Sequence, residues 1–113
     1  MVTPLSPTEL AQLLSSSRGV DMVDVRDQNE WDSGHIDGSR LVPLEQLRAD
    51  PDRELVRAPA IVFVCAKGIR SLAAAKLAER FGYEHVYTLD GGVKAWASAG
   101  FAVDQVDHAR AAA

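Results

Sequence analysis

The most informative part of the chain reads Val62-Phe63-Val64-Cys65-Ala66-Lys67-Gly68-Ile69-Arg70-Ser71. An apolar run enters the only cysteine, and a short loop that contains a glycine then leads into a sequence with helical periodicity. A strand, a tight loop and a helix in this order direct the N–H groups of the loop and of the first helical turn toward one point. We therefore predict that the loop from Cys65 to Arg70, closed by a helix that begins near Ser71, surrounds the cysteine sulfur with backbone donors.

Two cations in the same loop support this interpretation. A free thiol is mostly protonated at neutral pH, whereas a helix N-terminus and nearby positive charges lower the pKa of a thiol. Lys67 and Arg70 supply the charges here, and they also attract a small anion into the site. The alternative, an ordinary buried thiol at the end of a strand, gives the glycine and the cations no role. The loop therefore favours an anionic sulfur and predicts an oxyanion or a sulfur oxyanion as its guest.

Length and composition limit the possible functions. The 113 residues allow one compact domain with a core, but not two. With 12 Lys and Arg against 16 Asp and Glu, the net charge is -4, which argues against a general nucleic-acid-binding surface. No run of apolar residues approaches the roughly 18 residues of a membrane span, and no leader segment is expected. One free thiol without a second cysteine suits a reducing cytoplasm.

Strands and helices alternate along the rest of the chain. The predicted strands cover residues 20–26, 40–42, 60–64 and 85–89, and the predicted helices cover 7–14, 44–49, 71–81 and 93–99. A short helical turn is expected at 29–34, and either a second one or a charged surface connection at 52–57. Residues 101–103 are expected to add a short edge strand. This alternation predicts an α/β fold with three layers, α/β/α, and a mainly parallel sheet of about five strands.

A second group of charges is expected at the same edge of the sheet. Ligands of parallel α/β sheets bind beyond the carboxyl ends of the strands, and Asp24 and Arg26 end one strand as Cys65 ends another. We therefore consider Asp24, Arg26 and Ser71 as residues that support the site. In the structural alternative, Asp24 caps the next turn and Arg26 pairs with Glu30.

Three other positions are singled out with a structural role in view. His35 could serve as a general base, but a histidine beside a glycine and before an apolar residue is more typical of a hydrogen-bonded structural residue. Trp31 is expected in the core. The pair Gly91-Gly92 follows a predicted strand, and it permits a close backbone approach or an unusual backbone conformation near the active edge.

The order and spacing of these motifs resemble those of single-domain rhodaneses. The matching motifs are Asp24-Val25-Arg26, Glu30-Trp31, Gly34-His35-Ile36-Asp37-Gly38, the loop from Cys65 to Ser71, and Leu89-Asp90-Gly91-Gly92 with Trp96 and Gly100. Each motif alone is weak, whereas the ordered set spans nearly the whole chain. The resemblance implies a rhodanese-like domain over residues 1–105, and we expect residues 106–113 to form a frayed C-terminal tail.

The resemblance also implies a sulfurtransferase in which Cys65 carries the sulfur. The thiolate would attack the outer sulfur of thiosulfate, release sulfite and pass the resulting persulfide sulfur to cyanide or to another thiol. The implied substrate-binding residues are Ala66, Lys67, Gly68, Ile69 and Arg70. The cationic Lys67 resembles the loops of members that use thiosulfate, and a persulfide on a protein is a further possible donor. No cofactor, metal, nucleic acid or membrane partner is expected.

Two other functions fit part of the pattern. One is a rhodanese-like module that regulates or senses persulfides without turnover or with slow turnover, although such modules commonly lack the cysteine. The other is a related cysteine phosphatase or arsenate reductase, which also places a cysteine and an arginine around an oxyanion. The loops of those enzymes are longer, whereas only four residues separate Cys65 from Arg70. The shorter loop favours a pocket for sulfur.

Overall fold

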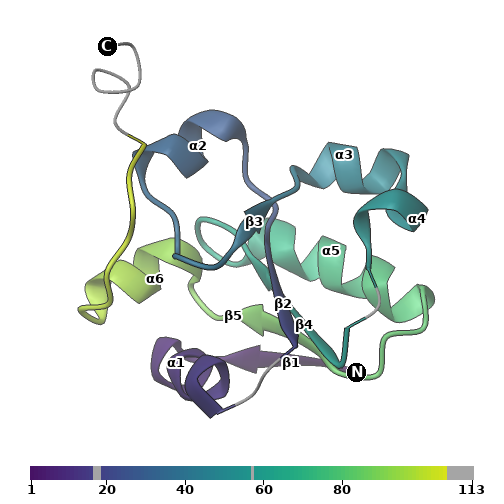
Figure 1. Ribbon diagram of the computed structural model, residues 1–113, viewed down its shortest axis with the longest axis horizontal. Coiled ribbons are helices and arrows are strands. Elements are labelled where there is room, and N and C mark those ends of the chain that lie inside the picture. Colours follow the sequence, from purple (N-terminus) through teal and green to yellow (C-terminus); the bar gives the residue numbers. More distant parts are fainter. Residues whose placement is uncertain (17–18, 57, 107–113) are drawn as a thin grey trace.

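A computed structural model of the protein describes residues 1–16, 19–56 and 58–106. Five parallel strands form one sheet in the order β1-β5-β4-β2-β3 (Figure 1). The strands are β1 (Val2–Leu5), β2 (Val20–Asp24), β3 (Arg40–Leu41), β4 (Ala60–Val64) and β5 (Val86–Leu89). The helices are α1 (Pro7–Ser16), α2 (Gln28–Ser33), α3 (Leu44–Ala49), α4 (Pro51–Glu54), α5 (Ile69–Arg80) and α6 (Gly92–Ser98). The predicted three-layer α/β fold with a parallel sheet is confirmed.

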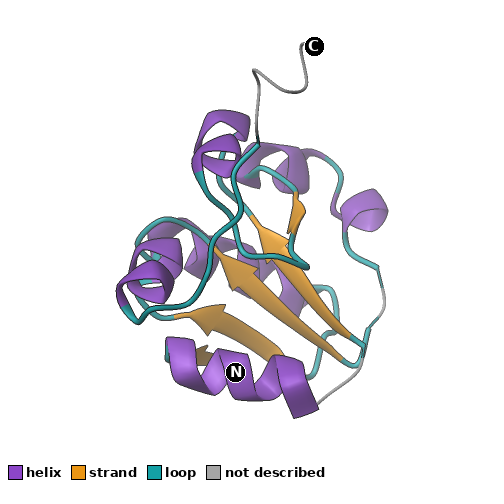
Figure 2. Ribbon diagram, turned by 60° about the vertical axis from the view of Figure 1, so that its left-hand side comes forward, coloured by secondary structure: helices purple, strands orange, loops and turns teal. Residues whose placement is uncertain are grey.

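β4 lies in the middle of the sheet and divides the core in two. Its five residues are all buried. Ile61 and Phe63 pack on the face that α3 and α5 cover, whereas Val62 and Val64 pack on the opposite face with residues of α1 and α6. Helices lie on both sides of the sheet (Figure 2). Because side chains alternate along a strand, a strand buried on both faces must be apolar throughout. Cys65 continues this alternation and belongs to the core on the α5 side.

α5 presses closely on the sheet because its inner face is small. The buried residues of this helix are Ser71, Ala74, Ala75 and Ala78, at the three- and four-residue spacing of one helix face. The helix begins at Ile69, two residues before the predicted start near Ser71. Gly68 causes the earlier start, because it adopts the left-handed conformation (φ 102°) and turns the chain directly into the helix. The N-terminus of α5 is thereby fixed above the end of β4.

The predicted edge strand at residues 101–103 is wrong. That segment forms no strand; Phe101 instead stacks on Trp96, with ring centroids 4.5 Å apart. The edge position is taken by β1, whose residues pair with β5. Pro4 conceals β1 in the sequence, because proline cannot donate a ladder hydrogen bond and is tolerated only where one side of the strand is unpaired.

The other predicted elements agree with the structure to within a few residues. β2 ends at Asp24 rather than at residue 26, β3 ends at Leu41, and the segment after Pro51 is helical. Most of the predicted tail, residues 107–113, lies outside the described residues. Within the described part of the chain, no helix has the length and apolar character needed to cross a membrane.

Candidate active site

Cys65 follows the carboxyl end of β4, and its side chain is only 1% exposed. The backbone N–H of Gly68 donates to its Sγ at 3.0 Å, and that of Ser71 donates at 3.4 Å. The thiol lies 3.4 Å from the Ser71 hydroxyl, which in turn donates to the Gly68 carbonyl at 3.2 Å. The backbone amides of Ile69 and Arg70, which lie between these two donors in the sequence, do not bond to the sulfur. The sulfur is thus buried but faces N–H groups at the start of a helix, an environment that favours negative charge.

The start of α6 holds the loop from the other side. The N–H of Val93 donates to the Cys65 carbonyl at 2.8 Å, and the N–H of Lys94 donates to the Ala66 carbonyl at 3.3 Å. Gly92 has φ 66°, and a Cβ there would lie 2.2 Å from the Cys65 carbonyl oxygen and 2.4 Å from that of Ala66. Only glycine fits such a contact. The predicted close backbone approach at the Gly91-Gly92 pair is therefore confirmed.

Asp24 and Arg26 form a buried ion pair beside the loop. Asp24 pairs with Val64 in the sheet, so both strands end at the predicted common edge. Arg26 donates from Nε to Asp24 Oδ1 at 2.9 Å and from Nη2 to Oδ2 at 2.8 Å, and Nη2 also donates to the Gly34 carbonyl at 2.7 Å. The predicted alternative in which Arg26 pairs with Glu30 is wrong, because the carboxylate two residues earlier is closer and equally buried.

Glu30 pairs with Arg70 instead, across forty residues of sequence. Arg70 donates from Nη1 and Nη2 to the two carboxylate oxygens at 2.7 and 2.8 Å. Mainly through these bonds, the guanidinium lowers the pKa of Glu30 to about 2, and Glu30 in turn raises the pKa of Arg70. Glu30 is placed by its own helix start, where it forms a reciprocal capping box with Asp27. The pair therefore ties α2 to the active-site loop.

The remaining loop side chains point outward. Lys67 is exposed and makes no ion pair within the described residues, and the Ile69 side chain is 80% exposed. The structure thus brings Cys65, Gly68 and Ser71 together, engages Arg70 with Glu30, and leaves Lys67 at the surface. Sequence reasoning missed Glu30 as the partner of Arg70. The capping-box spacing from Asp27 to Glu30 could have located the start of α2, but it contains no information about Arg70.

His35 and Trp31 contact each other rather than the cysteine. Their rings stack with centroids 3.7 Å apart, and His35 Nδ1 lies 2.9 Å from the Trp31 carbonyl oxygen. The His35 backbone forms an isolated antiparallel bridge with Asp104. These contacts favour the structural interpretation of His35. Trp31 is half-buried and lies in neither core cluster, contrary to its predicted place in the core.

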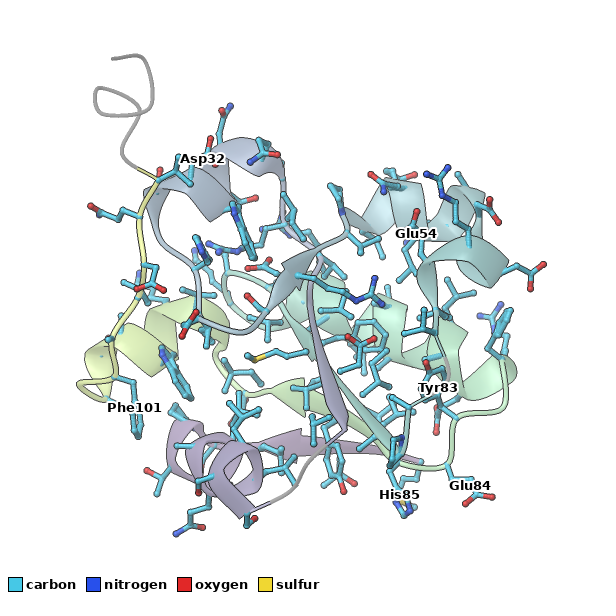
Figure 3. The ribbon with its side chains drawn as sticks, in the orientation of Figure 1. Asp32, Glu54, Tyr83, Glu84, His85 and Phe101 are labelled. Carbon is cyan, nitrogen blue, oxygen red and sulfur yellow. The ribbon has the colours of Figure 1, made fainter. Side chains whose placement is uncertain are left out.

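A hollow on the described surface lies away from Cys65. It has a volume of about 500 Å³ and is lined in part by Phe81, Tyr83 and Glu84. Tyr83 and Glu84 lie in the turn before β5, where the strands begin, whereas Cys65 lies where β4 ends (Figure 3). In the described residues, no group of three His, Cys, Asp or Glu side chains converges to hold a metal.

The fold and the site together define a class of protein. It is a parallel α/β domain in which one cysteine faces the N-terminus of a helix. Residues 6–99 match the family model of the rhodanese-like domain. The chain is 40% identical over 97 residues to thiosulfate sulfurtransferase GlpE of Shewanella oneidensis, and the match covers 81% of this chain and 89% of that protein. The chain belongs to the rhodanese-like domain family, as its motifs predicted.

Two further comparisons define the extent of the likeness. The chain is 35% identical over 94 residues to the probable adenylyltransferase/sulfurtransferase MoeZ of Mycobacterium tuberculosis; the match covers 82% of this chain but spans only 24% of that protein. The crystal structure of a rhodanese-related protein from Thermoplasma volcanium superposes with a TM-score of 0.79 at 25% identity, over 90% of this chain and 97% of that one. The chain therefore matches nearly the whole of a small rhodanese-related protein, but only one part of the longer MoeZ protein.

Proposed function

We propose that this protein is a sulfurtransferase that carries sulfur on Cys65. The observation that supports this most directly is the pair of N–H groups, from Gly68 and Ser71, that donate to Sγ at the start of α5. Preorganised donors of this kind stabilise charge that develops during a reaction. The cysteine thiolate is the nucleophile that takes up a sulfur atom. The outer sulfur of the resulting persulfide would also carry a negative charge.

The proposed reaction has two steps. In the first, the Cys65 thiolate attacks the outer sulfur of thiosulfate, a new S–S bond forms, and the S–S bond of thiosulfate breaks with its electron pair leaving on sulfite. In the second, a nucleophile such as cyanide or a thiolate attacks the outer sulfur of the Cys65 persulfide, and the electron pair returns to Cys65 as a thiolate. Neither step needs a dedicated general base when the attacking sulfur is already ionised.

Different residues of the loop would bind different parts of the sulfur donor. The amides of Gly68 and Ser71 donate to Sγ, and those of Ala66, Lys67, Ile69 and Arg70 would bind a second sulfur atom or a sulfonate. Lys67, as an exposed cation, would draw the anionic donor toward the loop. Arg70 commits two N–H groups to Glu30, so its contribution to binding would come from its charge and its remaining N–H donors.

Thiosulfate is the preferred donor for two reasons. The cationic loop suits a doubly charged donor, and the 40% identical relative from Shewanella oneidensis is a thiosulfate sulfurtransferase. A persulfide on another protein would deliver the same atom to Cys65 by the same attack. The acceptor is a thiol or another nucleophile that prefers sulfur.

The test measures both steps separately. The purified protein is incubated with thiosulfate, and intact mass is expected to show one added sulfur atom; cyanide then removes that atom and yields thiocyanate. Cys65→Ser is expected to abolish both signals, with an unchanged circular dichroism spectrum as the control for folding. Either signal surviving in Cys65→Ser would refute the role of this cysteine.

The same assays separate the rival functions. A persulfide that forms but is not passed on would indicate a sensing module rather than an enzyme. Hydrolysis of an aryl phosphate that depends on Cys65, without sulfur uptake from thiosulfate, would indicate a cysteine phosphatase.

A further inference from the structure

The outward side of α5 begins at the active-site loop. Its residues recur at the spacing of one helix face, opposite the buried alanines. We name this side the outer α5 face, and it consists of Ile69, Leu72, Ala73, Lys76 and Arg80. Ile69 is 80% and Leu72 is 44% exposed, which is unusual for large apolar side chains that lie so close together. The end of the face nearest the cysteine is therefore apolar.

The far end of the outer α5 face is basic. A groove of about 260 Å³ between α3 and α5 is lined by Arg48, Ala73, Lys76, Leu77 and Arg80. Lys76 and Arg80 form no ion pair within the described part of the chain.

The acidic groups near the groove do not cancel its charge. Arg48 is paired at 2.5 Å with Glu45, whose own side chain is 81% exposed. Glu79, the only acid of α5, is engaged by the N-terminal amine of Met1. On a chain of net charge -4, this groove is a local region of positive charge.

The two ends are separated by a distance that a short peptide can span. An α-helix rises about 1.5 Å per residue, so the eleven steps from Ile69 to Arg80 cover about 16 Å. An extended chain covers about 3.3 Å per residue, so about five residues reach from the loop to the far end of the groove. A thiol placed at Cys65 can therefore belong to a segment whose neighbouring residues lie along the outer α5 face.

We propose that the outer α5 face, with Arg48, docks an acidic partner protein that exchanges sulfur with Cys65. An apolar residue beside the partner's cysteine contacts Ile69 and Leu72, and acidic residues a few positions away bind Lys76 and Arg80. The exchange itself rests on the sulfurtransferase function proposed above. A nucleic acid fits less well, because the end of the face nearest the cysteine is apolar and the chain as a whole is acidic.

A binding experiment tests the surface without any sulfur chemistry. The Cys65→Ser protein is titrated with the peptide Ser-Gly-Leu-Gly-Glu-Asp-Glu, and the backbone amides are followed by NMR. Shifts are expected at Ile69, Leu72 and Lys76, and they are expected to weaken with added salt. A peptide with Lys at the three acidic positions is expected to give none of these shifts. The double variant Lys76→Glu/Arg80→Glu is expected to lose at least tenfold in affinity, whereas the matched control Arg53→Glu, in the exposed helix α4, is expected to lose none.

A transfer experiment tests the consequence for activity. Protein loaded with sulfur on Cys65 is mixed with the same two peptides carrying Cys in place of Ser, and loss of the sulfur is followed by mass. The acidic peptide is expected to accept sulfur at least tenfold faster than the lysine peptide, and Lys76→Glu/Arg80→Glu is expected to reverse this order. Turnover of thiosulfate with cyanide is expected to stay within twofold of the wild-type value in the same variant.

The outcomes separate the two proposals. Equal treatment of both peptides, shifts confined to surfaces other than the outer α5 face, Arg48 and the loop that begins at Cys65, or an unchanged preference in the double variant would refute the docking surface even if thiosulfate turnover is normal. An RNA oligomer that binds this face as tightly as the acidic peptide would also refute it, as would self-association that depends on Lys76 and Arg80. Peptide binding without any sulfur uptake from thiosulfate would instead leave the surface in place and refute the proposed enzyme.

Discussion

Two turns meet at the carboxyl edge of the sheet, and they are built by different means. The turn between β4 and α5 surrounds Cys65 with backbone N–H groups, and its shape depends on Gly68 and Gly92. The turn between β2 and α2 is held by charged side chains, with Asp24 and Arg26 buried in a bidentate pair. Backbone donors stay in place at every pH, whereas a buried ion pair rigidifies a turn but has no charge left for a ligand. In the proposed function, the first turn would serve the chemistry and the second would support it.

One contact joins the two turns. Glu30, in the first turn of α2, accepts hydrogen bonds from both terminal nitrogens of Arg70, which belongs to α5. The half-exposed Arg70 is thereby kept beside the loop, while Arg26 is withdrawn into the interior. Four tests distinguish the contributions of the two turns and of the bridge between them.

Asp24→Ala is expected to have the largest effect, because it leaves the Arg26 guanidinium buried without its counter-ion. The free energy of unfolding should fall by about 3–5 kcal/mol, measured by urea denaturation. Glu45→Ala, which breaks the exposed pair with Arg48, is the control and should cost less than about 1 kcal/mol. Equal losses in the two variants would contradict a supporting role for the buried pair.

Gly92→Ala tests the backbone-built turn. The new Cβ would meet the carbonyl oxygens of Cys65 and Ala66, so the loop must shift. A misplacement of that size can reduce kcat/KM for thiosulfate by about a hundredfold. Gly82→Ala is the matched control, since Gly82 also has positive φ (98°) but nothing lies within 4 Å of its Cβ position. It should cost stability alone, about 1 kcal/mol, and reduced turnover in Gly82→Ala would show that strain anywhere is enough.

Glu30→Gln cuts the bridge between the turns. Because the folded pKa of Glu30 is lowered from 4.5 to about 2, its carboxylate stabilises the fold above pH 4.5, and this contribution is lost as the pH falls toward 2. The variant should be less stable than wild type by about 1 kcal/mol at pH 7, with the difference vanishing near pH 2.

The partner of Glu30 provides the check. Arg70→Ala should lose the same pH-dependent contribution, and combining it with Glu30→Gln should add nothing further to that loss. Additive effects in this double-mutant cycle, measured by thermal unfolding between pH 2 and 7, would mean that the two side chains act independently.

Lys67→Ala is expected to have the smallest effect, because the side chain is exposed and unpaired within the described structure. KM for thiosulfate should rise by about threefold at low salt, with kcat unchanged, and the difference should shrink as salt screens the charge. Arg53→Ala removes an equally exposed cation from α4 and should leave KM unchanged. A fall in kcat, or an effect that salt does not alter, would place Lys67 in the chemistry rather than in attraction of the donor.

The sequence by itself determined the sheet layers and the position of the cysteine. The run from Ala60 to Val64 is apolar at every position, as a strand buried on both faces must be. The glycine and the helical periodicity after Cys65 then place the sulfur at a helix start. These are local rules, and they act within a few residues.

Only the tertiary structure decided which charged side chains form ion pairs and which strand occupies the edge of the sheet beside β5. Arg70 binds Glu30 forty residues away, and Gly92 packs against Cys65 from another helix. β1 takes the edge position beside β5 although Pro4 weakens its strand signal. Such choices depend on distances between elements that the fold creates, and no local pattern encodes those distances.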